Sequence, residues 1–209
     1  MRIFAIGDIH GCIEQLKSLI ETINPSKDDT LVFLGDYIDR GPDSQGVIDF
    51  LLHLKNRCKC IFLMGNHEDE LIKYCSGKDG DFFRNIGGRE TIASYTKSKA
   101  KRFTDCLPES HWEFFNSLLL YHEDESYIYV HSGIKPSVPL KDQDKEDLLW
   151  KTNENYSTGM SKKVIYGHRV NIIPRVDSDK IGIDTGCIIT GVLTAIELPQ
   201  ETFIQTKKT

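Results

Sequence analysis

The chain has 209 residues and a formal net charge of −5, with 39% apolar and 27% charged residues. A chain of this length and composition can bury one large core and fold without disulfide staples. Its pI near 5.8 argues against non-specific nucleic-acid binding, which normally shows as a basic face or tail. No apolar run approaches the roughly 20 residues of a membrane helix, and Met1 runs almost directly into a predicted strand, which leaves no room for a leader. We therefore expect a cytoplasmic protein that binds neither nucleic acid nor a membrane.

Apolar runs that stop at glycine alternate with helical patterns in the first third of the chain. Residues 3–6, 31–34 and 61–64 predict buried strands, because each is a short apolar run bounded by a turn signal. Between them, residues 13–23 and 47–54 carry apolar side chains at helical spacing. This alternation predicts right-handed βαβ crossovers and a largely parallel sheet.

The middle of the chain has a different pattern. Residues 75–125 are predicted to be helical or irregular and to form a cap or lid within a single domain that spans residues 1–209. Further strands are expected at 127–130, 164–166, 180–183 and 191–198. The tail after Pro199 is expected to be loose.

Side chains that can bind metal ions follow five of these predicted strands: Asp8 and His10, Asp36, Asn66, His131, and His168. Asp8 and His10 are two residues apart just beyond a predicted strand, where we expect extended backbone, so both can reach one ion. Asp36 has two carboxylate oxygens and can bridge two ions, and the other three side chains would complete the second ion's shell. Oxygen and imidazole ligands together suit manganese, iron or zinc.

Two metal ions at one site would favour displacement at phosphorus, because their charges can hold both the attacking oxygen and the phosphoryl oxygens. A hydroxide that bridges the ions would then be the nucleophile. His67 adjoins a predicted ligand and could protonate the leaving oxygen. Asp39 could hold that imidazole in its donor state, and Arg40 could clamp the phosphoryl oxygens with two hydrogen bonds.

These motifs carry a family resemblance. The segments concerned are Gly7–Gly11, Gly35–Gly41, Gly65–Glu68, His131–Gly133 and Gly167–His168. In order and spacing they resemble the signature of the phosphoprotein phosphatase branch of the calcineurin-like metallophosphoesterases. The resemblance covers nearly the whole chain, and the small size is similar to that of compact bacterial and phage serine/threonine protein phosphatases.

The resemblance implies a four-layered α/β sandwich, in which helices flank two mixed β-sheets, and a centre of two divalent metal ions, usually manganese. The first ion would be bound by Asp8, His10 and Asp36, and the second by Asp36, Asn66, His131 and His168. By the same resemblance, His67 would be the general acid paired with Asp39, and Arg40 would bind phosphate.

The chain departs from the family pattern at one place. A second phosphate-binding arginine commonly follows the tryptophan that matches Trp150, but this sequence has Lys151 there. Either Lys151 or Arg169 substitutes, with Asn66 and Arg40 as the other substrate-binding residues, or the phosphate clamp is weaker than in the family. A lysine offers a point charge without the two-pronged geometry of arginine.

The favoured hypothesis is a phosphomonoester hydrolase that acts on phosphorylated serine or threonine in proteins or peptides, with side activity on phosphotyrosine. Its nearest rival is a symmetrical bis(5'-nucleosyl)-tetraphosphatase, although such relatives usually have alanine where this chain has Asp39 and aspartate where it has Glu68. A phosphodiesterase or nuclease ranks third. A non-catalytic module that binds phosphorylated ligands would be expected to have a broken ligand set, and this set is complete.

Overall fold

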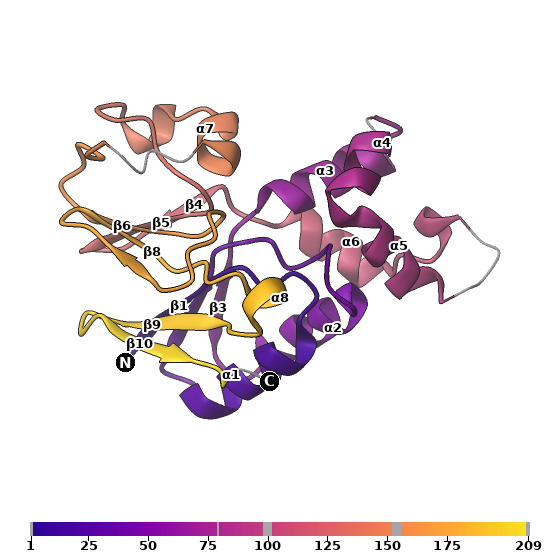
Figure 1. The fold of residues 1–209 in the computed structure, drawn as a ribbon, viewed down its shortest axis with the longest axis horizontal. Helices are drawn as coiled ribbons and strands as arrows, with labels where there is room; N and C mark the ends of the chain where they lie inside the picture. Colours follow the sequence, from indigo (N-terminus) through magenta and orange to yellow (C-terminus); the bar gives the residue numbers. More distant parts are fainter. Residues whose placement is uncertain (1, 79, 98–101, 152–155, 208–209) are drawn as a thin grey trace.

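The computed structural model describes residues 2–78, 80–97, 102–151 and 156–207, which form two stacked β-sheets with helices on their outer faces (Figure 1). The first sheet has the strand order β10–β9–β1–β2–β3 and the second has the order β4–β5–β6–β8–β7. The strands are β1 (Ile3–Ile6), β2 (Thr30–Phe33), β3 (Lys59–Phe62), β4 (Tyr121–Glu123), β5 (Tyr127–Val130), β6 (Lys163–Tyr166), β7 (Arg175–Val176), β8 (Lys180–Gly182), β9 (Thr194–Leu198) and β10 (Thr202–Gln205). This is the predicted calcineurin-like fold.

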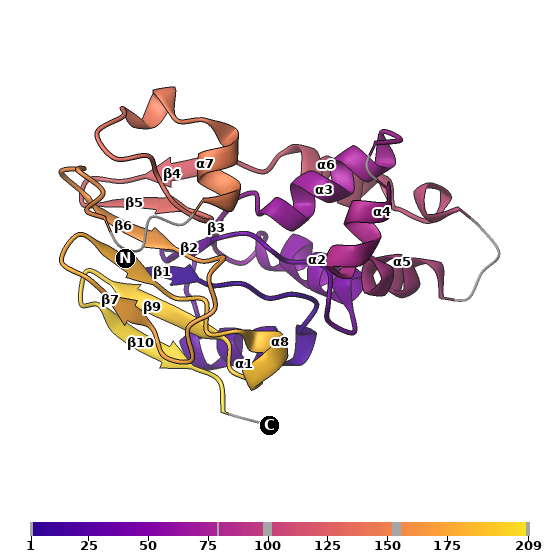
Figure 2. The same ribbon diagram turned by 45° about the horizontal axis from the view of Figure 1, so that its top comes forward.

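The helices cover both outer faces and gather at one end of the sandwich. They are α1 (Ile13–Ile23), α2 (Ser44–Leu54), α3 (Asn66–Cys75), α4 (Gly80–Phe83), α5 (Arg89–Thr96), α6 (Glu109–Asn116), α7 (Lys145–Trp150) and α8 (Cys187–Thr190). In Figure 2, α1 lies below the first sheet, α7 lies above the second, and α3 to α6 lie together beyond the strand ends. Among the described residues, no helix is long and apolar enough to cross a membrane.

Both sheets are mixed: each has three neighbouring strands that run parallel, and two further strands that pair antiparallel with a neighbour. In the first sheet β1, β2 and β3 run parallel, with Ile3 opposite Thr30 and Thr30 opposite Lys59, whereas β9 and β10 are antiparallel. In the second, β5, β6 and β8 are parallel, and β4 and β7 are antiparallel at the edges. The parallel strands therefore bring their carboxyl ends to a common edge of each sheet.

Successive side chains of each strand point to opposite faces of the sheet, and this explains how the layers are held together. Phe4 packs into the cluster shared with the helices below the first sheet, whereas Ala5 packs into the cluster between the sheets. In the second sheet Tyr129 faces the first sheet, and Ile128 faces the opposite side with Leu148 of α7. Because successive side chains of a strand point to opposite faces, apolar runs of this kind can be buried on both sides.

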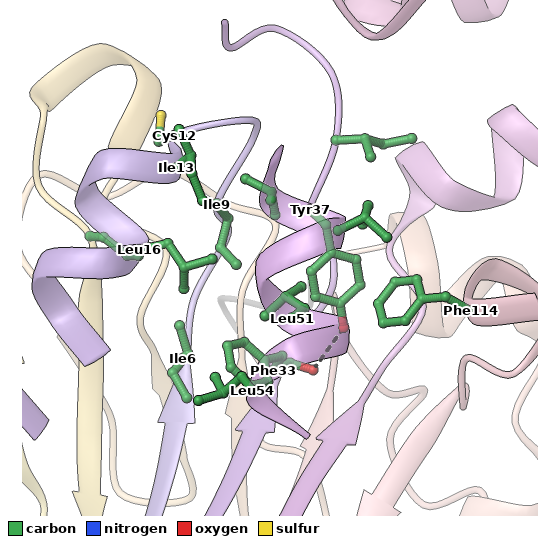
Figure 3. Packing of buried hydrophobic residues seen from close by; sticks show 14 of the residues in the cluster. Ile6, Ile9, Cys12, Ile13, Leu16, Phe33, Tyr37, Leu51, Leu54 and Phe114 are labelled. Carbon is green, nitrogen blue, oxygen red and sulfur yellow. Dashed lines mark hydrogen bonds between the residues drawn. The ribbon is translucent and has the colours of Figure 1, made fainter. Parts of the chain in front are cut away.

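The largest core cluster joins the first sheet to the helices (Figure 3). Ile6 and Phe33 point from the sheet toward α1 and α2, and Tyr37 packs edge-on against Phe114 of α6 with ring centroids 5.4 Å apart. The buried hydroxyl of Tyr37 donates to the Leu63 carbonyl at 2.7 Å. Phe114 belongs to the segment predicted as a cap, so that segment shares the core of the first sheet.

Two predictions of secondary structure were wrong, one for the tail after Pro199 and one for residues 75–125. The tail after Pro199 forms β10, whose Phe203 lies opposite Ile196 of β9. The predicted helical or irregular segment 75–125 contains helices but also β4, whose Tyr121 pairs with Val130. Both strands are four residues or fewer and lie at sheet edges. Such short runs acquire their conformation from the neighbouring strand, which no local pattern reveals.

Candidate metal centre

The predicted ligands converge where the parallel strands of both sheets end. Asp8 and His10 follow β1, Asp36 follows β2, and Asn66 is the first residue of α3, just after β3. From the second sheet, His131 follows β5 and His168 follows β6. All but the partly buried His168 are buried. This is the edge at which open α/β sheets place their ligand sites.

Asp36 lies between two groups of imidazoles. Its Oδ2 is 3.4 Å from His10 Nε2 and 3.9 Å from His67 Nε2. Its Oδ1 is 3.5 Å from His131 Nε2 on the other side. Ligand atoms of His10, Asp36 and His67 lie within 4.8 Å of one another, as do those of Asp36, His131 and His168. One carboxylate thus takes part in both groups, which is the arrangement that a bridging ligand requires.

Three acceptor atoms meet in the second group. Asn66 Oδ1 lies 2.9 Å from His131 Nε2 and 3.0 Å from His168 Nδ1, and the two nitrogens are 3.2 Å apart. The Nδ1 of His131 donates to the Leu34 carbonyl at 2.9 Å, and burial lowers its pKa, so its Nε2 presents a lone pair. At most one hydrogen, on His168 Nδ1, is then available to three electron-rich atoms. The donor set fits a divalent cation.

The first group, formed by His10, Asp36 and His67, also contains a histidine whose tautomer is fixed by a backbone carbonyl. His10 Nδ1 donates to the Ile38 carbonyl at 2.9 Å, and burial lowers the pKa of His10 to about 3. The ring is therefore neutral at physiological pH, and its Nε2 lone pair faces Asp36. A backbone carbonyl that fixes the tautomer of a histidine is a usual partner of metal-binding imidazoles.

Asp8 lies beside these groups and belongs to neither of them. Its two carboxylate oxygens accept the His168 backbone N–H at 3.0 and 3.1 Å. Burial, together with the nearby carboxylates of Asp184 and Asp36, raises the pKa of Asp8 well above its ordinary value. A cation would offset the mutual repulsion of these carboxylates. That Asp8 binds the first ion stays a prediction.

His67 is paired with a buried carboxylate. Its Nδ1 donates to Asp39 Oδ2 at 2.7 Å, and Thr91 Oγ1 donates to Asp39 Oδ1 at 2.5 Å. Burial opposes protonation of His67, but Asp36 and Asp39 raise its pKa on balance. Its Nε2 is buried and has no hydrogen-bond partner among the residues that the structure describes. This nitrogen is thus oriented toward the metal groups and can carry a proton there.

Arg40 lies next to the first group and is exposed. One of its terminal nitrogens donates to His10 Nε2 at 3.0 Å, and its Nε donates to the Ile86 carbonyl at 3.3 Å. The other two predicted anion-binding residues lie outside the two groups. Lys151 Nζ is 2.8 Å from Asp147 Oδ1, and Arg169 is exposed directly after His168. Their contacts with substrate stay predictions.

The backbone of the site is strained. Nine non-glycine residues of the described chain have positive φ, and five of them are His10, Asp36, Asp39, Arg40 and His168. Left-handed backbone is uncommon for residues with a Cβ and persists where the surroundings over-determine it, often at functional sites. Glycines that have no room for a side chain lie beside these turns. A Cβ at Gly65, for example, would collide with the Asp36 carboxylate.

Two residues that orient the site were missed by the sequence analysis. Thr91 holds Asp39 from 52 positions away in the chain, and no local pattern could have indicated it. Glu68, noted only as a family difference, accepts backbone N–H groups of the loop that carries Asp36. The sequence could have indicated this role, because an acidic residue at the third position of a helix commonly binds backbone N–H groups at the helix start.

Comparisons with known proteins agree with this geometry. A family model described as calcineurin-like phosphoesterase matches residues 1–185. The chain belongs to this family. It is therefore a metal-dependent phosphoesterase, and the His/Asp groups above are where the divalent ions of that family would bind.

Individual relatives span nearly the whole chain. A bis(5'-nucleosyl)-tetraphosphatase PrpE of Oceanobacillus iheyensis, named as asymmetrical, is 29% identical over 98% of this chain and 91% of its own length. A structure described as "Crystal structure of a putative diadenosine tetraphosphatase" has a TM-score of 0.75 and 23% identity, with 98% and 92% of the two chains covered. A cold-active protein tyrosine phosphatase has a TM-score of 0.73 and 16% identity, with 99% and 79% covered. The two structural likenesses are evidence for the fold.

Proposed function

We propose that this protein hydrolyses bis(5'-nucleosyl) tetraphosphates and cleaves them asymmetrically, into a nucleoside triphosphate and a nucleoside monophosphate. The main support is the full-length similarity to the PrpE relative, whose name states that activity. The chain covers 91% of that relative, so the similarity is not confined to a shared metal-binding core. This favours the rival considered in the sequence analysis over a protein phosphatase, with asymmetrical instead of symmetrical cleavage.

The proposed roles follow from the site geometry. Divalent cations, with manganese, iron or zinc as the expected choices, would polarise the phosphoryl oxygens and lower the pKa of a water molecule at the site. Arg40 is placed to bind a phosphoryl oxygen, because its guanidinium lies within hydrogen-bond distance of His10. His67 would donate a proton from Nε2 to the leaving oxygen, with Asp39 holding its Nδ1–H.

A protein serine/threonine phosphatase is the second candidate, and one observation favours it. His67 and Asp39 form a buried pair, with an Nδ1 to Oδ2 distance of 2.7 Å, and such a pair could act as an oriented proton donor. A serine or threonine alkoxide is strongly basic and needs a proton as it leaves, whereas a nucleotide phosphate can leave as a stable anion. Such a donor is therefore more valuable for phosphoserine than for a polyphosphate.

A substrate comparison separates the two candidates. Metal-depleted protein would be resupplied with manganese, iron, zinc or magnesium and offered diadenosine tetraphosphate, phosphoserine peptides and phosphotyrosine peptides. We expect the highest kcat/KM for the dinucleotide, and ATP plus AMP as products by ion-exchange chromatography. Two ADP molecules would mean symmetrical cleavage. A preference for phosphoserine peptides would replace the proposed function with the second candidate.

A further inference from the structure

A cavity of about 520 Å³ adjoins the metal centre between α3, α4 and α7. Its lining residues are Asp69, Glu70, Lys73, Phe82, Lys145, Glu146, Leu149 and Trp150. This volume lies in the range of small-molecule sites, which is about 300–1,000 Å³. No residue predicted to bind metal or phosphate lines it, so the roles proposed above leave the cavity unused.

Two aromatic rings form one wall of the cavity. Phe82 and Trp150 have ring centroids 6.0 Å apart and planes inclined at 47°. The two rings already touch, so no third ring fits between them, and a planar ligand would stack on their outer faces. Phe82 is 46% exposed, which is unusual for so large an apolar side chain and leaves its face available. Aromatic walls of this kind bind nucleobases by stacking.

The same wall touches the metal centre. The ring of Trp150 lies edge-on to the ring of His168, with centroids 6.1 Å apart. The cavity is also lined by Asp69 and Glu70 of α3, the helix whose first two residues are Asn66 and His67. A base stacked on Trp150 would therefore be close to the metal groups. In asymmetrical cleavage the broken bond adjoins the phosphate that carries a nucleoside, so one base must lie near the reacting centre.

The charged groups of the cavity suit a ligand that carries both amines and phosphates. Lys145 Nζ is 2.5 Å from Asp69 Oδ1, and Lys73 Nζ is 2.6 Å from Glu70 Oε1. The carboxylates are buried and can accept from an exocyclic amine of a base, whereas the lysines are half-exposed and can turn toward phosphate oxygens. The two lysines offset the charges of Asp69 and Glu70, and the third carboxylate of the cavity, Glu146, lies 3.9 Å from Lys151 Nζ.

We propose that this cavity binds one nucleobase of the dinucleotide, stacked on the wall formed by Phe82 and Trp150. The inference rests on the proposed function and extends it, because it assigns the part of the molecule that distinguishes a dinucleotide from a simple phosphate ester.

The first test compares substrates with and without a base. Phe82→Ala should increase KM for both substrates by different factors, and the factor for diadenosine tetraphosphate should be about ten times that for p-nitrophenyl phosphate. The reason is that stacking on one aromatic ring contributes about 5- to 150-fold to base affinity. Phe82→Tyr should restore the wild-type values. Leu119→Ala is the matched control, because Leu119 is 47% exposed and lies outside this cavity. An equal effect on both substrates would overturn the inference.

A binding measurement gives a readout without turnover. Trp112 and Trp150 are the only tryptophans, so Trp112→Phe protein reports on Trp150 alone. In metal-free protein, diadenosine tetraphosphate should quench this fluorescence, whereas tripolyphosphate, which lacks a base, should not. Phe82→Ala should weaken the quenching titration by about tenfold. Equal quenching by tripolyphosphate, or a titration unchanged by Phe82→Ala, would contradict stacking at this wall.

Failure of the inference differs from failure of the proposed function. Hydrolysis of the dinucleotide with unchanged KM in Phe82→Ala would remove the base site and leave the proposed function intact. Absence of hydrolysis, combined with quenching that depends on Phe82, would remove the proposed activity and leave a nucleotide-binding cavity. Absence of both hydrolysis and quenching would overturn both.

Discussion

Glu68 holds the loop that carries Asp36: its Oε2 accepts the Asp36 backbone N–H at 3.0 Å. The same oxygen accepts from Gly65 N at 3.0 Å, and Oε1 accepts from Tyr37 N at 2.9 Å and Ile38 N at 3.3 Å. One buried carboxylate thus satisfies four backbone donors and ties the turn after β2 to the start of α3. The position of Asp36 between the two metal groups depends on this contact.

Replacing Glu68 with Gln should destabilise this loop. The amide nitrogen of glutamine would face two backbone N–H groups that now bind a carboxylate oxygen. Leaving two buried donors unsatisfied costs roughly 2–6 kcal/mol in the free energy of unfolding. Urea denaturation would measure the loss, with the exposed Glu21→Gln as control. A variant as stable as the wild-type protein would show that Glu68 does not hold the loop.

Thr91→Val should lower turnover without unfolding the protein. The hydroxyl of Thr91 donates to Asp39 Oδ1 and accepts the Asp39 backbone N–H at 2.9 Å. Valine keeps the shape and removes both contacts, so the orientation of the His67–Asp39 pair should loosen, and kcat should fall about tenfold. The exposed Thr22→Val provides the control. If kcat were unchanged while circular dichroism remained native, the Thr91 contact would have no part in catalysis.

His67→Asn tests the proton donor. Asparagine can still donate to Asp39, so the buried carboxylate keeps a partner, but it cannot protonate a leaving oxygen. Turnover of aryl phosphates should fall about 10²–10⁴-fold. The loss should be larger for phenyl phosphate than for p-nitrophenyl phosphate, because phenolate is the more basic leaving group. The exposed His53→Asn is the control, and an equal loss on both esters would argue against proton donation by His67.

An ion pair remote from the site should make stability depend on pH. Arg2 donates to Asp29 from its backbone and its guanidinium, at 2.8 and 2.7 Å, and these contacts hold the pKa of Asp29 below its ordinary value. Because the folded-state pKa is depressed, the stabilisation is complete above about pH 4 and disappears as the pH falls.

Asp29→Asn should therefore lower the melting temperature at pH 7 by about 2–4 °C, the shift caused by about 1 kcal/mol in a chain of this size. The difference from the wild-type protein should shrink below about pH 4. Melting curves from pH 3 to 7 would measure it, with the exposed neighbour Asp28→Asn as control. A difference that stayed constant with pH would show that the charge of Asp29 is not its source.

The sequence predicted the parallel strands of the first sheet and the buried strands at the centre of the second. Strands β1, β2, β5 and β6 are apolar runs buried on both faces, and each ends just before a side chain of the site. Because parallel strands share an edge, the meeting of Asp8 with Asp36 could be predicted within the first sheet, and that of His131 with His168 within the second. That the two sheets bring these pairs together was predicted from the ligand chemistry and the family resemblance. The edge strands β4, β7 and β10 could not, since their two to four residues depend on a neighbour for their conformation.

Details of the site that depend on tertiary packing were also beyond local patterns. The predicted anion-binding Lys151 forms an ion pair with Asp147, four positions earlier in the chain, and the spacing alone did not reveal which partner it takes. Thr91 reaches Asp39 only because α5 packs beside α2. Substrate class was the other difficulty, because Asp39 and Glu68 favoured a protein phosphatase whereas whole-chain similarity favours a dinucleotide hydrolase.

The central claim is that Asp36 bridges two divalent ions, and crystals soaked in manganese test it most directly. Anomalous difference maps should contain two peaks about 3.5–4 Å apart, one beside each carboxylate oxygen of Asp36. The same soak of Asp36→Asn crystals should lose at least one peak. A single peak in the wild-type protein, or two full peaks in the variant, would contradict the account.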